Sequence, residues 1–285
     1  MDIKRVGIVG SGIMGSGIAE VAAKAGFEVT LRSRSDQGAQ SMVTGLEKSL
    51  AKLVDKGRLD DAERTAVQGR VRAVTALSEL AECELVLESI VEDLAPKTEL
   101  FAELHSICGD GAILATNTST LSVEAVAAST GRPAQVCGIH FFNPATAMPL
   151  VELVHTDQTS DETLAAARAF AESCGKTVVD VRDQAGFVVN ALLFPYLNNA
   201  VKLLDAGVAN RDDIDAAMKG GCNFPMGPLE LLDLVGLDTS LAIIEALYAE
   251  FDDANDEPAP MLARLVQDGK LGRKTGAGFY DYSKK

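Results

Sequence analysis

The residues best placed for acid–base chemistry are a histidine and a carboxylate twelve positions later in the chain. His140 ends an apolar strand pattern that starts at Val136, and α/β folds bind ligands at the carboxyl ends of their strands. Glu152 interrupts an apolar run, where a lone carboxylate needs a partner. His140 is the simplest partner, because the carboxylate would orient the imidazole and favour its protonated form. Composition alone leaves this pairing open, and it predicts surface or packing roles for His105 and His155.

A glycine-rich turn near the start of the chain has the spacing of a dinucleotide-binding loop. Gly10, Gly12 and Gly15 form the pattern GxGxxG between a predicted strand, Val6–Val9, and a predicted helix, Met14–Lys24. The first glycine permits the tight turn, the second lets the backbone approach a pyrophosphate, and the third lets the helix pack closely on the strand. The helix N-terminus then offers unpaired N–H groups to phosphate oxygens. We therefore expect a dinucleotide cofactor.

The end of the second predicted strand, Glu28–Leu31, lacks the acidic residue that usually binds the adenosine ribose. The expected position falls at Ser33, which keeps a small hydrogen-bonding group and removes the charge that repels a 2′-phosphate. Arg34, with or without Arg32, is then available to bind that phosphate through a planar guanidinium. Asp36 lies three residues late and is better suited to cap the next helix. We expect NADP(H) to be preferred, with NAD(H) as the alternative and solvent-facing arginines as the non-functional interpretation.

Strand and helix patterns alternate through the first part of the chain, which predicts a Rossmann-type, doubly wound and mostly parallel sheet. The expected domain covers residues 1–183. The further predicted elements are helices at 36–56, 60–68, 96–107 and 163–173 and strands at 85–88, 113–116, 136–140 and 177–181.

From residue 184 to 285 the patterns are almost entirely helical, which predicts a smaller all-helical domain for dimerisation and substrate binding. Its first helix, expected at 186–205, contains Pro195, which should kink it. That helix has more apolar residues than one side of a small bundle needs, so we expect a homodimer through this region. The apolar residues in question are Phe187, Leu192, Leu193, Tyr196, Leu197, Val201 and Leu204.

The composition of the chain restricts the classes of molecule that the protein is expected to bind. The net charge of −15 argues against nucleic acid and anionic membrane, and it means that an anionic ligand needs local basic residues. The odd number of cysteines, five, without a CxxC spacing, predicts reduced thiols, and we expect no metal. The N-terminus runs directly into a strand pattern, and no apolar run reaches the ~18 residues of a membrane helix. The sequence therefore predicts a cytoplasmic protein.

Seven motifs occur together in an order and spacing that resemble the 3-hydroxyacyl-CoA dehydrogenase family, and in particular its bacterial members that act on 3-hydroxybutyryl-CoA. The resemblance covers essentially the whole chain. The motifs are the glycine loop, Ser89-Ile90-Val91-Glu92-Asp93, Asn117-Thr118-Ser119, His140-Phe141-Phe142-Asn143-Pro144, Gly186-Phe187-Val188-Val189-Asn190, Met226-Gly227-Pro228-Leu229-Glu230-Leu231 and Lys274-Thr275-Gly276-Ala277-Gly278-Phe279-Tyr280.

The resemblance implies catalytic roles for four residues. His140 matches the general base that takes the proton of the substrate hydroxyl during oxidation and returns it during reduction, and Glu152 matches the acid that orients it. Ser119 and Asn190 match residues that hydrogen-bond the substrate. The family usually has an arginine where this chain has Ala191, which puts a local ion pair in doubt but not the chemistry.

The resemblance also implies ligand contacts. Lys52 and Lys56, four positions apart on one helix face, match positions near the CoA phosphates, although a solvated face is the alternative. The positions that match cofactor contacts are Gly10, Gly12, Ile13, Met14, Gly15, Ser33, Arg34, Glu92, Lys97, Asn117 and Asn143.

The expected activity is hydride transfer between NADP(H) and acetoacetyl-CoA or (S)-3-hydroxybutyryl-CoA. Two alternatives remain: a dehydrogenase of a free hydroxy acid on the same scaffold, and a non-enzymatic structural relative similar to a lens crystallin. A structural protein has no packing reason to retain His140, Glu152, Ser119 and Asn190 together, which favours an enzyme.

Overall fold

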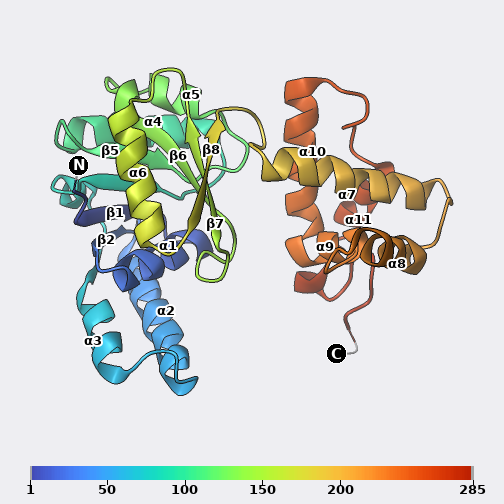
Figure 1. Cartoon of the computed structure of the whole chain (residues 1–285), viewed down its shortest axis with the longest axis horizontal. Coiled ribbons are helices and arrows are strands. Elements are labelled where there is room, and N and C mark those ends of the chain that lie inside the picture. Colours follow the sequence, from blue (N-terminus) through green and yellow to red (C-terminus); the bar gives the residue numbers. More distant parts are fainter. Residues whose placement is uncertain (1, 284–285) are drawn as a thin grey trace. The chain divides into compact units, whose positions relative to one another are not determined.

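The computed structural model describes residues 2–283 and divides the chain into two compact units, Met1–Asp183 and Gln184–Lys285 (Figure 1). The first unit is built around a sheet, and the second is helical. Each unit has its own hydrophobic core. This arrangement confirms the predicted fold class.

Within residues 2–283, eight strands form one sheet in the order β3-β2-β1-β4-β5-β6-β7-β8. Neighbouring strands are parallel except for β6 and β7, which are antiparallel. The chain starts in the middle and winds outward on both sides, so the glycine loop lies where the winding direction changes. The strands are β1 (Arg5–Val9), β2 (Glu28–Arg32), β3 (Val71–Val74), β4 (Leu85–Glu88), β5 (Ile113–Thr116), β6 (Val136–Phe141), β7 (Leu150–His155) and β8 (Thr177–Arg182).

Helices cover both faces of the sheet. The helices of this unit are α1 (Ile13–Lys24), α2 (Asp36–Asp55), α3 (Asp61–Gly69), α4 (Leu94–Ile107), α5 (Val123–Ala128) and α6 (Asp161–Ser173). Ile18 of α1 and Phe170 of α6 pack in one core with Ile8 and Ile139 from the strands. On the opposite face, Gly138 of β6 leaves room for Val123 of α5. Figure 1 shows α2 and α3 projecting from one end of the sheet as a helical hairpin.

The helix after β2 begins with a serine cap. Ser35 has an extended backbone, and its hydroxyl accepts a hydrogen bond from the backbone N–H of Gly38 at 3.1 Å. Asp36 is already the first helical residue, so the prediction that Asp36 is the cap was wrong by one position. A serine in this position satisfies one of the unpaired N–H groups of the first turn, and the acidic side chain of Asp36 then faces the positive end of the helix.

The second unit is a bundle whose C-terminal segment is tied to it by a buried carboxylate. Its helices are α7 (Val189–Asp205), α8 (Arg211–Cys222), α9 (Pro228–Val235), α10 (Leu237–Phe251) and α11 (Pro260–Gln267). Asp233 of α9 accepts hydrogen bonds from the backbone N–H groups of Phe279 and Tyr280 at 2.9 and 2.8 Å. None of the described helices in either unit is long and apolar enough to cross a membrane.

The first helix of this unit starts later than the sequence pattern predicts. Gly186 and Phe187 have positive φ angles of 71° and 52°, which a right-handed helix does not accommodate, so α7 begins at Val189. Pro195 lies inside α7 as predicted.

Candidate active site

The histidine and glutamate identified in the sequence form a cross-strand pair. His140 of β6 and Glu152 of β7 lie directly opposite each other in the antiparallel register, which explains their spacing of twelve residues. Their side chains are buried, and the Nδ1 atom of His140 lies 2.8 Å from Oε2 of Glu152. A carboxylate only accepts hydrogen bonds, so this contact places the Nδ1 proton toward Glu152 and turns Nε2 to the other side.

Ser119 lies at that other side of the imidazole. Its Oγ atom is 3.1 Å from Nε2 of His140. The segment that carries Ser119 follows β5. It is held to β6 by a hydrogen bond at 2.8 Å, which Oδ1 of Asn117 accepts from the backbone N–H of Phe141. Glu152, His140 and Ser119 therefore form a continuous hydrogen-bonded series at the carboxyl end of β5 and β6. Such a series can move a proton to or from a bound oxygen.

A cluster of charges around a fully buried lysine lies beside this series. Lys97 of α4 is 0% exposed, and its ammonium group lies 2.7 Å from Oε1 of Glu88 and 3.2 Å from Oε2 of Glu92. Burial raises the pKa of Glu92, but the Lys97 charge and the hydrogen bonds from Thr118 and Ser119 outweigh burial and lower it. Glu92 is therefore a carboxylate at neutral pH. Glu88 and Thr118 were not identified from the sequence; a glutamate ending an apolar strand nine residues before a lysine was the available signal.

The glycine loop has the geometry that a pyrophosphate requires. Gly10 has φ of 131°, and a Cβ there would collide with the carbonyl oxygen of Ser89. A Cβ at Gly15 would collide with the carbonyl oxygen of Gly10, whereas a Cβ at Gly12 would point into open space. Gly12 is also the N-cap of α1, with no side-chain cap and no acidic residue in the first turn. An anion fits here, because uncapped N–H groups and a positive helix end face an approachable backbone.

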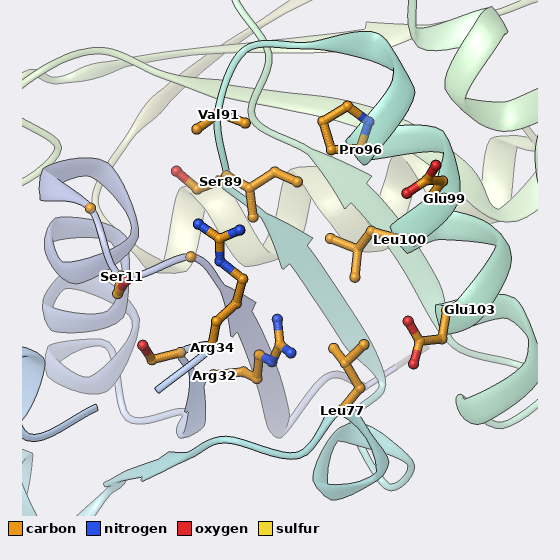
Figure 2. A pocket seen from close by; sticks show the side chains of 14 residues that line it. Ser11, Arg32, Arg34, Leu77, Ser89, Val91, Pro96, Glu99, Leu100 and Glu103 are labelled. Carbon is orange, nitrogen blue, oxygen red and sulfur yellow. The ribbon is translucent and has the colours of Figure 1, made fainter. Parts of the chain in front are cut away.

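A cavity of about 450 Å³ extends from this loop (Figure 2). Its volume and its continuity with the glycine loop suit the adenosine half of a dinucleotide. Next to it, Ile13 is 77% exposed, which is unusual for a large apolar side chain at the start of a core helix. The cavity is lined by Gly10, Ser11, Gly12, Arg32, Ser33, Arg34, Leu77, Ser89, Ile90, Val91, Pro96, Glu99, Leu100 and Glu103.

The end of β2 contributes two arginines and no carboxylate to the cavity. Ser33 is buried, and its hydroxyl packs against Gly38 in the first turn of α2. Arg34 is exposed, and Figure 2 shows both guanidinium groups extending into the space between the glycine loop and α4. The Nε atom of Arg32 donates to the carbonyl oxygen of Thr75 at 3.1 Å, which fixes its orientation. Burial lowers the pKa of Arg32, and the charge of Glu103 opposes that effect.

Several other predicted residues are not among those that line this cavity. Lys52 lies in the last turn of α2, and Lys56 follows that helix; both are exposed. Asn143 is exposed after β6, and Met14 lies half-buried in α1. Asn190 is a buried residue of α7 in the second unit. The lysine pair and Asn190 remain predicted ligand contacts.

The comparisons with known proteins identify the class of this protein. It is a two-domain oxidoreductase, in which a dinucleotide-binding α/β unit is followed by a helical unit. The family model of the 3-hydroxyacyl-CoA dehydrogenase NAD-binding domain matches residues 5–184, and that of the C-terminal domain matches residues 186–282. The chain therefore belongs to the 3-hydroxyacyl-CoA dehydrogenase family, which confirms the resemblance inferred from its motifs.

Individual relatives match over nearly the full length. The chain is 46% identical to a 3-hydroxybutyryl-CoA dehydrogenase of Mycobacterium tuberculosis, over 98% of this chain and 99% of that protein. It is 44% identical to a probable 3-hydroxybutyryl-CoA dehydrogenase of Bacillus subtilis, over 100% of this chain and 99% of that protein. The crystal structure of (S)-3-hydroxybutyryl-CoA dehydrogenase from Ralstonia eutropha superposes with a TM-score of 0.96 at 42% identity, covering 99% of this chain and 100% of that one.

Proposed function

We propose that this protein is an (S)-3-hydroxybutyryl-CoA dehydrogenase that interconverts acetoacetyl-CoA and 3-hydroxybutyryl-CoA with NADP(H). The observation that carries the chemistry is the hydrogen-bonded series Glu152–His140–Ser119, in which Nε2 of a buried histidine faces a hydroxyl at the carboxyl edge of the sheet. The substrate is assigned from the names of the relatives that match over nearly the whole chain.

His140 is the general base and acid in this proposal. During oxidation its Nε2 accepts the proton of the substrate hydroxyl, and during reduction the imidazolium returns that proton to the carbonyl oxygen. Glu152 accepts the Nδ1–H hydrogen bond at 2.8 Å, so it orients the ring and stabilises the imidazolium. Ser119 hydrogen-bonds the reacting oxygen, and Asn190 keeps the substrate contact that the family resemblance implies. The nicotinamide cofactor, when bound, supplies or accepts the hydride at carbon 3.

The residues that would hold the cofactor fit an anionic dinucleotide. Gly10, Gly12 and Gly15 permit the turn and the close backbone approach, and the uncapped N-terminus of α1 meets the pyrophosphate. The exposed Ile13 gains an apolar partner when the dinucleotide lies over the loop.

The preference for NADP(H) is supported by the charges at the end of β2. An acid at this position would repel a 2′-phosphate, and Ser33 removes that repulsion. Arg34 is exposed at the cavity and is better placed than Arg32 to bind the 2′-phosphate. Arg32 already donates a hydrogen bond to Thr75 and interacts electrostatically with Glu103. The cofactor phosphate would also compensate the cost of half-burying Arg32.

Binding of the CoA moiety is assigned to Lys52 and Lys56. Both side chains are exposed near the end of α2, where they add local positive charge to a chain whose net charge is −15. Phosphate contacts of this kind are needed because the overall field repels an anionic substrate.

The substrate assignment is tested by comparing acetoacetyl-CoA with free acetoacetate in an assay of NADPH consumption. We expect efficient turnover only with the CoA thioester, because its phosphates and pantetheine supply binding energy that free acetoacetate lacks. Higher kcat/KM for free acetoacetate would instead favour a dehydrogenase of free hydroxy acids. If NADPH is not consumed with either compound, the result would favour a structural protein.

We further expect a homodimer built through the helical unit. Most of the apolar residues predicted on α7 pack within the unit, including Leu197 and Val201, but Leu192 is 72% and Leu203 47% exposed. Light scattering should give a mass of about twice that of the 30.0 kDa chain. Leu192→Asp should weaken the association, whereas Val179→Asp, on β8 of the first unit, should not. A monomer at micromolar concentration would contradict the dimer.

A further inference from the structure

Glu92 makes an unusually dense set of contacts with the segment that carries Ser119. Its Oε1 atom accepts a hydrogen bond from the hydroxyl of Thr118 at 2.5 Å and from the backbone N–H groups of Ser119 and Thr120 at 2.7 and 3.2 Å. Three donors from three successive residues therefore converge on one carboxylate oxygen. Hydrogen bonds to a charged acceptor are stronger than those to a neutral one, so this contact fixes the turn after β5.

The other oxygen of Glu92 forms an ion pair with a buried lysine. Its Oε2 atom lies 3.2 Å from the ammonium group of the fully buried Lys97, which is itself held by Glu88 at 2.7 Å. Glu88 in turn accepts hydrogen bonds from the hydroxyl of Thr116 at 2.7 Å and from the backbone N–H of Ile90 at 2.6 Å. The carboxylate of Glu92 is thus anchored to β4, α4 and β5 through one buried cation.

The segment held in this way presents the hydroxyl of Ser119 to His140. While the backbone N–H of Ser119 binds Glu92, its Oγ atom lies 3.1 Å from Nε2 of His140. A change in the backbone at Ser119 would change the direction of its hydroxyl. Small displacements matter here, since misplacing a catalytic group by about 1 Å can reduce a rate by about 100-fold.

We infer that Glu92 is a positioning residue for the reaction: with Lys97 behind it, it holds the turn at 118–120 so that the Ser119 hydroxyl meets His140 and the reacting oxygen of the substrate. This role rests on the proposed function of Ser119. The family resemblance implies that Glu92 and Lys97 contact the cofactor, and positioning of Ser119 is an additional role. It predicts that the two residues affect proton transfer between His140 and the substrate.

Glu92→Gln tests the inference because a carboxamide cannot reproduce the contacts. Glu92 accepts hydrogen bonds on one oxygen and faces the Lys97 ammonium with the other. A glutamine has one oxygen, so its NH₂ group must face either Lys97 or the N–H groups of Ser119 and Thr120, which sets donor against donor. We expect kcat for acetoacetyl-CoA reduction to fall by about tenfold or more.

A double-mutant cycle with Ser119→Ala separates positioning from cofactor contact. If Glu92 acts through the Ser119 hydroxyl, Glu92→Gln should lower kcat by less than about twofold once that hydroxyl is absent. If Glu92 acts on the cofactor, the two losses should multiply, and equal fold-losses in both backgrounds would overturn the inference. Glu124→Gln, an exposed carboxylate change on α5, is the matched control and should leave kcat unchanged.

Amide hydrogen exchange provides a readout that does not depend on activity. The N–H groups of Ser119 and Thr120 should exchange slowly in the wild type and at least about tenfold faster in Glu92→Gln. Unchanged exchange at both amides would overturn the inference whatever the activity. Faster exchange in a protein that does not reduce acetoacetyl-CoA would instead show that Glu92 holds the turn and that the substrate assignment has failed.

Thr118→Val is the second variant if Glu92→Gln does not fold. It removes the hydroxyl that donates to Glu92 and accepts from the N–H of Leu121 at 2.9 Å, with little change in side-chain volume. We expect the same dependence on the Ser119 hydroxyl in its own double-mutant cycle. A loss that is equal with and without that hydroxyl would again overturn the inference.

Discussion

His140→Gln is expected to lower kcat by about 100- to 10,000-fold, with a much smaller effect on acyl-CoA binding. Glutamine retains polar atoms near the imidazole nitrogens but cannot take up a proton from the substrate hydroxyl. Its interaction with the Glu152 carboxylate, 2.8 Å from Nδ1 in the wild type, is retained in part, so the fold should survive. Steady-state kinetics with acetoacetyl-CoA, combined with equilibrium binding of the substrate, separates the two effects.

Glu152→Gln and His155→Gln are the companion variants. Glu152→Gln should also be severe, because the imidazole loses the carboxylate that orients it and stabilises its charge. His155→Gln alters a histidine at the far end of β7 and should retain turnover close to that of the wild type. Near wild-type turnover of His140→Gln would show that another group transfers the proton.

Ser33→Asp combined with Arg34→Ile is expected to shift the cofactor preference from NADPH toward NADH. The aspartate restores a charge that repels the 2′-phosphate and accepts hydrogen bonds from the ribose, and the second change removes the exposed guanidinium. One charge-assisted hydrogen bond is worth about 1.5–3 kcal/mol, or roughly a 10- to 150-fold preference. The ratio of kcat/KM for the two cofactors should therefore change by at least about tenfold.

The structure adds a constraint and a control to this experiment. The hydroxyl of Ser33 packs against Gly38, so the aspartate must turn toward the cavity or replace the serine contact with the first turn of α2. Arg72→Ile removes an arginine of β3 that pairs with Glu79 outside the cavity, and it should leave the cofactor ratio unchanged. An unaltered ratio in the Ser33→Asp, Arg34→Ile variant would refute the role assigned to Arg34.

The sequence predicted the parts of this protein that depend on strong local patterns. The glycine loop and the alternating strands and helices identify the doubly wound sheet, since its central strands β4, β5 and β6 are buried on both faces. A lone carboxylate in an apolar run suggested Glu152 as a partner of His140 without deciding it, and the family resemblance supported the pair. The antiparallel register of β6 and β7 accounts for it. Residues inside regular elements are thus predictable because their environment is repetitive.

Elements with weaker patterns were missed. β3 was not predicted, because Val71–Val74 is a short edge strand whose residues are half-buried or exposed. α5 was not predicted either, since it is six residues long. Short elements of this kind form because their neighbours hold them, and the local sequence gives little indication of that.

The network around Glu92 could not be predicted for a different reason. Family resemblance associated Glu92 and Lys97 with the cofactor, yet Lys97 is fully buried between two carboxylates. The contacts with Thr118 and Ser119 join loops that are 26 and 27 residues apart in the chain. Nothing in the residue types alone specifies which loops meet, because that depends on the tertiary path of the chain.

The most direct test of the proposed function is the initial rate of acetoacetyl-CoA reduction by the wild-type protein, measured with NADPH and with NADH. We expect turnover with both cofactors and a kcat/KM at least about tenfold higher with NADPH, because Arg34 meets the 2′-phosphate and Ser33 does not repel it. Equal or better efficiency with NADH would contradict the cofactor assignment, and oxidation of neither cofactor would contradict the dehydrogenase itself.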